Sequence, residues 1–90
     1  MGATAESMRL KLQRGLNPEK LEIIDRSDRH VGHAGAREGG ESHFDVVVVA
    51  AAFTGLNRVQ RQRLVYSLLA EELAGPVHAL SLVARSPGEA

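Results

Sequence analysis

The sequence predicts a small α+β domain, in which helices pack on one face of a three-stranded mixed sheet. Two segments have apolar residues at helical spacing, and three shorter segments are rich in Val, Ile and Leu. Gly, Asn and Pro stand at the joints between these segments. The chain has 90 residues, which is enough for a single domain over 1–90, with an ordered core expected at about 5–87.

The two predicted helices cover residues 5–16 and 58–73. In each, apolar residues recur three or four positions apart and therefore lie on one side of the helix. The first is expected to end near Gly15 and the Asn-Pro pair that follows, because proline cannot continue a helix. The second begins after Asn57, a good N-cap residue, and stops at Gly75 and the proline after it.

The three predicted strands cover residues 20–26, 42–50 and 77–84. The β-branched run Val46–Val49 is typical of a strand buried on both faces. The helix before the last strand forms a right-handed crossover, which makes the last two strands parallel, whereas the first two are antiparallel. The glycine-rich segment 27–41 joins the first two strands and is predicted to be a long functional loop.

Composition narrows the classes of function. Basic and acidic residues balance at 11 each, which argues against a protein that coats nucleic acid or a membrane. The chain has no cysteine, so it cannot hold an iron–sulfur cluster through its own thiolates, and a reducing compartment is its natural place. The longest apolar run is far shorter than the ~20 residues of a membrane helix, and the first residues lack a signal-peptide pattern. We therefore expect a cytoplasmic protein without membrane association.

Four histidines are the candidate metal ligands, because imidazole is a common ligand and titrates near neutral pH. His30 and His33 lie in the glycine-rich loop, His43 opens the second strand, and His78 is expected one residue into the third. Taken one at a time, each is more typical of a structural residue than of a ligand. Enzyme motifs are missing: there is no cysteine nucleophile, no nucleophile elbow and no dinucleotide or phosphate-loop fingerprint. A binding function is therefore favoured over catalysis.

Three arginines, Arg58, Arg61 and Arg63, lie in the first turns of the second predicted helix, where their charge opposes the helix dipole. Two interpretations have equal weight. Either solvent screening and tertiary contacts reduce the unfavourable energy of this arrangement, or the arginines and the helix N-terminus form a site for a carboxylate or phosphate of a partner.

An ordered series of short motifs resembles the BolA family. The motifs are Asp25-x-Ser27, a His-containing loop, Gly40-Glu41-Ser42-His43-Phe44, Phe53-x-Gly55-Leu56, Arg61-x-Arg63-Leu64-Val65-Tyr66, Leu69-Ala70-Glu71-Glu72-Leu73 and Val77-His78-Ala79-Leu80-Ser81. They extend from about Met8 to Pro87, and residues 60–81 are the most specific part. The resemblance implies a KH-like fold with the order αββααβ, including a short helix or turn near Arg58 before the main second helix.

The resemblance also implies a function. BolA-like proteins pair with monothiol glutaredoxins, and the heterodimer holds a two-iron two-sulfur cluster to which the BolA side supplies histidine, in cluster assembly, cluster transfer or iron regulation. One implied ligand is His78, in the His-Ala-Leu motif, and the other is His30 or His33. The glutaredoxin cysteine and glutathione would supply thiolates, so no cofactor is expected in the isolated chain. Contacts with the glutaredoxin or glutathione are expected at Arg61, Arg63 and Ala79.

Some BolA-like proteins act in transcription, so the resemblance carries the alternative of a DNA-binding regulator. The candidate DNA contacts are Arg58, Arg61, Arg63 and Arg85. The zero net charge and the scarcity of aromatic residues argue against this alternative. Gln62 stands where the family usually has a histidine, which puts in doubt a third imidazole there. A weak homodimer of the free chain is left open.

Overall fold

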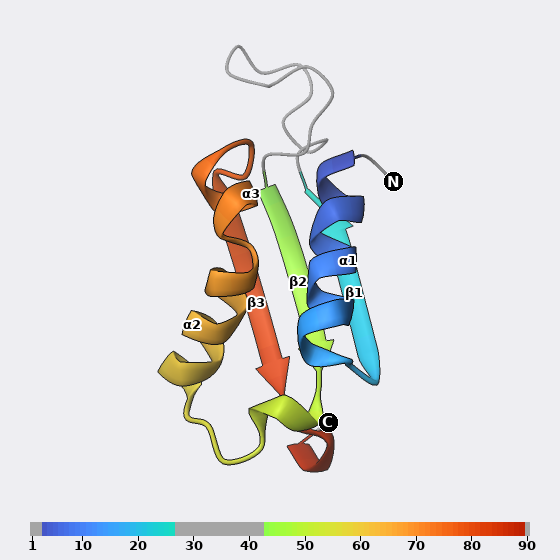
Figure 1. Cartoon of the computed structure of the whole chain (residues 1–90), viewed down its shortest axis with the longest axis vertical. Helices are drawn as coiled ribbons and strands as arrows, with labels where there is room; N and C mark the ends of the chain where they lie inside the picture. Colours follow the sequence, from blue (N-terminus) through green and yellow to red (C-terminus); the bar gives the residue numbers. More distant parts are fainter. Residues whose placement is uncertain (1–2, 27–42, 90) are drawn as a thin grey trace.

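A computed structural model describes residues 3–26 and 43–89 of the chain. Its elements are α1 (Ala3–Leu16), β1 (Lys20–Asp25), β2 (His43–Val49), the 3-10 helix η2 (Ala51–Phe53), α2 (Arg58–Leu68), α3 (Ala70–Ala74), β3 (Ala79–Arg85) and the 3-10 helix η3 (Pro87–Glu89). Figure 1 labels the α-helices and the strands. Apart from the two 3-10 turns, the order is the predicted αββααβ. The predicted loop 27–41 lies outside the described residues.

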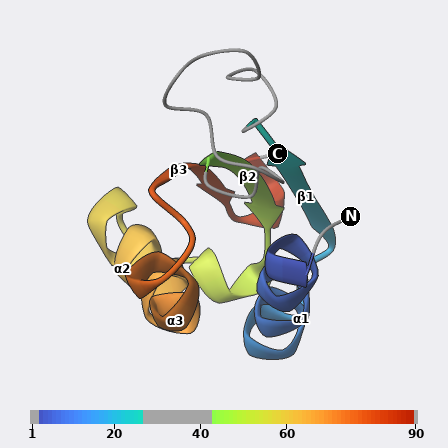
Figure 2. The same cartoon turned by 90° about the horizontal axis from the view of Figure 1, so that it is seen from above.

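The sheet has the predicted topology, with the strand order β1-β2-β3. β1 and β2 are antiparallel, and β2 and β3 are parallel. The helices α1, α2 and α3 lie on the same side of the sheet, as the view along its strands shows (Figure 2). None of the described helices is long and apolar enough to cross a membrane.

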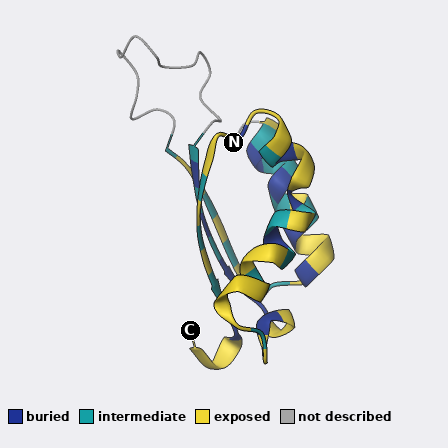
Figure 3. Ribbon diagram, turned by 90° about the vertical axis from the view of Figure 1, so that its left-hand side faces the viewer, coloured by how far each residue is buried: buried dark blue, intermediate teal, exposed yellow. Residues whose placement is uncertain are grey.

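The core lies between this face of the sheet and the helices, where buried residues of both layers meet (Figure 3). The central strand β2 contributes Phe44, Val46 and Val48, all at most 2% exposed. The intervening Val47 is only half-buried, because no described helix covers the second face of the sheet. On this second face Val49 is nevertheless 2% exposed, so the expected burial of the run Val46–Val49 is confirmed except at Val47.

The first helix ends at Leu16 as predicted, but Gly15 does not end it. It continues through Gly15 to Leu16, and Asn17 ends it in the left-handed conformation, with φ of 46°. The Asn17 amide donates to the carbonyl of Gln13 at 3.0 Å. Gly15 serves a packing role instead, because a Cβ there would lie 2.7 Å from Cδ2 of Leu68. A glycine at this position lets α1 approach α2 closely.

The predicted helix 58–73 is in fact two helices. Asn57 is the N-cap as predicted, and it forms a reciprocal capping box with Gln60 at 2.8 and 2.9 Å. The chain leaves helical geometry at Leu69, where φ is −103° and ψ is 19°. The short helix therefore follows the long one, whereas the family resemblance placed it before, near Arg58. Apolar spacing continues across Leu69, so the periodicity gives no sign of the break.

Candidate functional site

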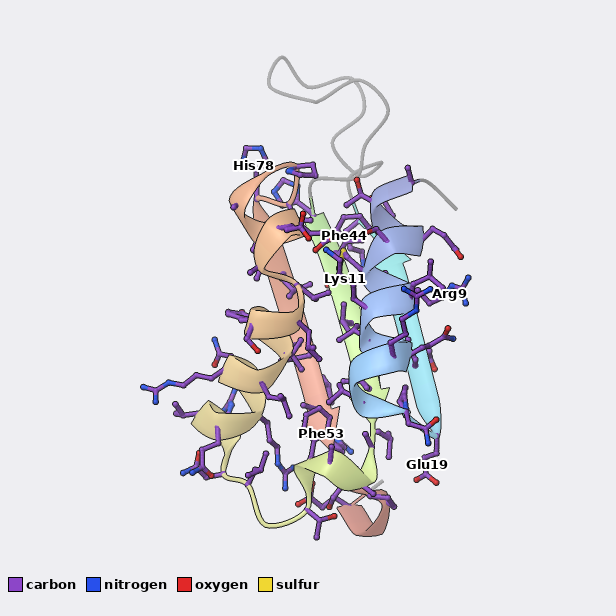
Figure 4. The ribbon with its side chains drawn as sticks, in the orientation of Figure 1. Arg9, Lys11, Glu19, Phe44, Phe53 and His78 are labelled. Carbon is purple, nitrogen blue, oxygen red and sulfur yellow. The ribbon has the colours of Figure 1, made fainter. Side chains whose placement is uncertain are left out.

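His78 lies at the end of the molecule where β2 and β3 begin (Figure 4). β3 starts at Ala79, so the prediction that His78 is inside the strand is wrong by one residue. The side chain is exposed, whereas its neighbour Val77 is 4% exposed and packs into the core. The Val77 amide also donates to the carbonyl of Glu72 at 3.0 Å. An exposed imidazole thus follows directly on a buried and hydrogen-bonded residue.

The first residue of β2 lies next to this connection. His43 is opposite Ala79 in the parallel register, and its carbonyl accepts a 2.7 Å hydrogen bond from the Arg26 amide. Arg26 and His43 are the described residues that flank 27–42. The other two candidate ligands, His30 and His33, are inside that segment and lie outside the described residues. The two described residues that flank this segment are therefore held at the end of the sheet where β2 and β3 begin, which is also where His78 lies.

A buried carboxylate holds α3, and with it the connection to His78, against α1. Glu72 is 6% exposed, and its carboxylate accepts hydrogen bonds from Ser7 Oγ at 2.6 Å and Lys11 Nζ at 3.0 Å. Figure 4 shows Lys11 on the side of α1 that faces α3, where it also contacts Glu71 at 2.9 Å. Burial raises the pKa of Glu72, but the hydrogen bonds from Lys11 and Ser7 outweigh it and keep the pKa below its ordinary value.

Sequence reasoning missed Glu72 as a supporting residue. Ser7 and Lys11 are four positions apart on α1, which places both beside its apolar stripe. That spacing was available as a signal. Their acceptor is 65 positions from Ser7, however, and no local pattern connects the two ends of such a contact.

The described residues offer an incomplete donor set for a metal. No group of three His, Asp or Glu residues within them could hold a metal ion. The whole chain has no cysteine, so it supplies no thiolate. Of the two described histidines, His78 is exposed and His43 is half-buried.

The candidate arginines differ in their surroundings. Arg61 is turned inward: its Nε donates to the Leu56 carbonyl at 2.9 Å and its Nη1 to the Ala84 carbonyl at 3.2 Å. Its Nη2 also donates to the Glu89 carboxylate at 2.9 Å. The Arg61 guanidinium, together with the Ser86 amide, lowers the pKa of Glu89 to about 2. Arg61 thus ties α2 to β3 and to the C-terminal turn.

Arg58, Arg61 and Arg85 line a groove of about 810 Å³ between α2, β3 and η3, whereas Arg63 is exposed on α2 and is not a lining residue. Ala79 is next to His78 at the other end of β3. The structure therefore brings Ala79 to the histidine, but it does not bring the arginines there.

Comparisons of the sequence and the structure with known proteins point to the same family. The family model for BolA-like proteins matches residues 12–89. The chain is 48% identical over 89 residues to BolA-like protein 1 of Bos taurus, covering 99% of this chain and 63% of that protein. It thus spans less than two thirds of the length of that relative.

Two further comparisons agree. The chain is 47% identical over 77 residues to the DNA-binding transcriptional regulator BolA of Escherichia coli K12, covering 86% of this chain and 70% of that protein. Its structure is similar to the BolA domain of SufE1 from Arabidopsis thaliana, with a TM-score of 0.88, 42% identity and coverage of 100% and 99% of the two chains. The family match, the sequence identities and the shared fold lead to one conclusion: the chain belongs to the BolA-like family.

Proposed function

We propose that this chain is a binding protein that pairs with a monothiol glutaredoxin and contributes histidine to a shared two-iron two-sulfur cluster. Its ligands would be His78 and one of His30 or His33, and its role would be cluster assembly, cluster transfer or iron regulation. The observation that carries the proposal is the exposed imidazole of His78, on a connection anchored by the buried Val77.

The chemistry of the donors supports a shared cluster. Histidine ligation of one iron and thiolate ligation of the other is an established combination in Rieske centres. This chain has histidines and no cysteine, so the thiolates would come from the glutaredoxin and from glutathione. A cluster held this way belongs to the complex, and the isolated chain is expected to be colourless.

The surroundings of His78 support a fixed position for its backbone. A ligand is most effective when the residues behind it hold it in place. Here the Val77 side chain is buried, its amide is bonded to Glu72, and Ala79 enters the parallel ladder opposite His43. The histidine is thus exposed at its ring while the backbone on both sides is held.

The test is reconstitution of the cluster in a mixture of this chain, a monothiol glutaredoxin, iron, sulfide and glutathione. We expect a heterodimer that absorbs visible light, and a changed spectrum or lost absorbance with His78→Ala. His43→Gln is the matched control, because His43 is the first residue of the central strand and is expected to be structural. Of His30→Ala and His33→Ala, one should behave like His78→Ala and the other like the control. A native spectrum with His78→Ala would falsify the assignment.

A DNA-binding regulator is the second candidate, favoured by two observations. The relative from Escherichia coli is named a DNA-binding transcriptional regulator. In addition, Arg58, Arg63 and Arg85 are exposed on this chain. A gel shift with duplex DNA at low salt tests this alternative, and binding should weaken steeply with added salt and with Arg58→Ala. The absence of any shift at low salt would exclude it.

A further inference from the structure

β3 has a free edge. It is the last strand in the order β1-β2-β3, so within the described residues only one of its edges is paired. The Arg85 carbonyl accepts from the Ala50 amide at 3.0 Å, whereas the Ala84 carbonyl accepts from Arg61 of α2 at 3.2 Å. Because backbone groups alternate in direction along a strand, those of Leu82 point outward together with those of Ala84.

The free edge borders the groove described above. α2 lies alongside β3 (Figure 1), and the groove between them holds about 810 Å³. Its walls include the apolar side chains of Leu56, Leu82 and Ala84. A helix beside an exposed strand edge is the geometry in which extended peptides add to a sheet, with backbone hydrogen bonds for affinity and side-chain contacts for specificity.

The charges of the groove favour a carboxylate. Arg58, Arg61 and Arg85 line it, and Glu89 is its one acidic lining residue among the described residues. Arg61 already holds the carboxylate of Glu89 through its guanidinium. Arg58 and Arg85 are exposed at the same groove, and their side chains have no hydrogen bond or ion pair to the described part of the chain. The groove is therefore positive and already binds a carboxylate from its own chain.

We propose that this groove binds an extended, glutamate- or aspartate-bearing segment of a partner protein, which adds to the free edge of β3 as a fourth strand. The outward backbone groups of Leu82 and the outward amide of Ala84 pair with the segment, while the Ala84 carbonyl keeps its hydrogen bond from Arg61. Arg58 and Arg85 bind its carboxylates through charge-assisted hydrogen bonds. This site is distinct from the proposed cluster site, because Arg85 is six residues beyond Ala79, or about 20 Å along the strand.

A peptide fits the groove better than a nucleic acid does. Single-stranded nucleic acid is bound on aromatic platforms, and Tyr66 is the only aromatic residue among the described lining residues. The strand edge offers alternating backbone donors and acceptors at the spacing of another strand, which a phosphate backbone cannot match. The apolar wall likewise suits the alternate side chains of an extended peptide.

The experiment titrates the ¹⁵N-labelled full chain with a blocked hexapeptide of alternating glutamate and valine. We expect saturable shifts and slower hydrogen exchange at the amides of Leu82 and Ala84. Arg58→Ala and Arg85→Ala should each weaken binding by roughly tenfold, as expected for loss of one hydrogen bond to a charged group. Arg63→Ala is the matched control, since it removes the same charge from α2 outside the groove and should change affinity less than about twofold.

Two further probes separate strand addition from simple charge attraction. Two further peptides carry N-methyl groups at every second residue, one at the odd and one at the even positions. The peptide whose methylated amides face β3 should lose binding, and the other should keep it. A lysine–valine peptide should not bind. The proposal is overturned if both N-methylated peptides bind like the parent, if the shifts lie away from β3, if no binding occurs at millimolar peptide, or if duplex DNA shifts these amides and the peptide does not. None of these outcomes affects the cluster assay, which depends on His78.

Discussion

The hydroxyl of Ser7 on α1 donates a 2.6 Å hydrogen bond to the carboxylate of Glu72 on α3, 65 positions along the chain. The backbone carbonyl of Glu72 in turn accepts the amide of Val77, the residue before His78. The first helix is thereby connected through one residue to the position of the proposed ligand. Under the proposed function, this connection links the α1–α3 contact to the position of the ligand as well as to stability.

Removal of the Ser7 hydroxyl should destabilise the fold. We expect Ser7→Ala to lower the free energy of unfolding by about 1.5 kcal/mol, because the buried Glu72 carboxylate loses a donor while Lys11 still neutralises it. Urea unfolding measures the change. Ser67→Ala is the control: among the described residues its exposed hydroxyl bonds only the carbonyl of Leu64 in its own helix, so unfolding should be nearly unchanged. Equal effects of both variants would contradict the role of Glu72.

Acid should weaken the same contact. The folded-state pKa of Glu72 is below the ordinary value of 4.5, so the folded state binds this proton less readily than the unfolded chain does. Its contribution is therefore complete above about pH 4.5 and is lost as the pH falls through the folded pKa. Glu89, with a folded-state pKa of about 2, also contributes stability that is lost on acidification, down to a lower pH.

The measurement is the free energy of unfolding between pH 6 and pH 2 for the native chain and for Glu72→Gln. The native chain should lose stability on acidification, and the variant should show a smaller slope because it has no carboxylate to protonate at this position. Identical slopes would show that Glu72 is not shifted in the folded state.

The helical side of the core should be sensitive to truncation. Leu12 is fully buried between α1 and the sheet, so Leu12→Ala should cost about 2–5 kcal/mol from lost burial and the cavity left behind. Leu10 is on the same helix but 39% exposed, and Leu10→Ala should cost much less. Thermal or urea unfolding of the pair compares the two faces of α1, and similar losses would place the core elsewhere.

The capping box of α2 should also be measurable. Asn57→Ala removes the side-chain acceptor for the Gln60 amide and should cost about 1 kcal/mol of unfolding free energy. Asn57→Gly should lower the free energy of unfolding by only a few tenths of a kcal/mol, because glycine is itself a favourable N-cap. A larger loss with glycine than with alanine would show that the cap is not what Asn57 contributes.

Much of the fold follows from local pattern. Met8, Leu12 and Leu16 recur at helical spacing and are all buried, and the right-handed crossover correctly predicts the parallel pairing of β2 with β3. The break at Leu69 does not follow, because apolar spacing is the same on both sides of it. The start of β3 at Ala79 also depends on a distant partner, His43, rather than on the Gly-Pro pair nearby.

The candidate sites also depend partly on local pattern and partly on contacts between distant parts of the chain. Sequence reasoning grouped Arg58, Arg61 and Arg63 because they are close along one helix, but their directions on that helix differ. Arg61 turns inward because Leu56, Ala84 and Glu89 offer it oxygen acceptors. The last two come from 23 and 28 positions away, so only the tertiary structure reveals them. Identification of His78 as the principal candidate came from the family resemblance rather than from its local surroundings.

The most direct test of the proposed function is the reduction potential of the reconstituted heterodimer with His78→Cys. Histidine ligation raises the potential of a two-iron two-sulfur cluster relative to full cysteine ligation. If His78 is a ligand, the cysteine variant should retain a cluster with a lower potential and an altered visible spectrum. A potential and spectrum identical to those of the native complex would show that His78 does not bind the cluster.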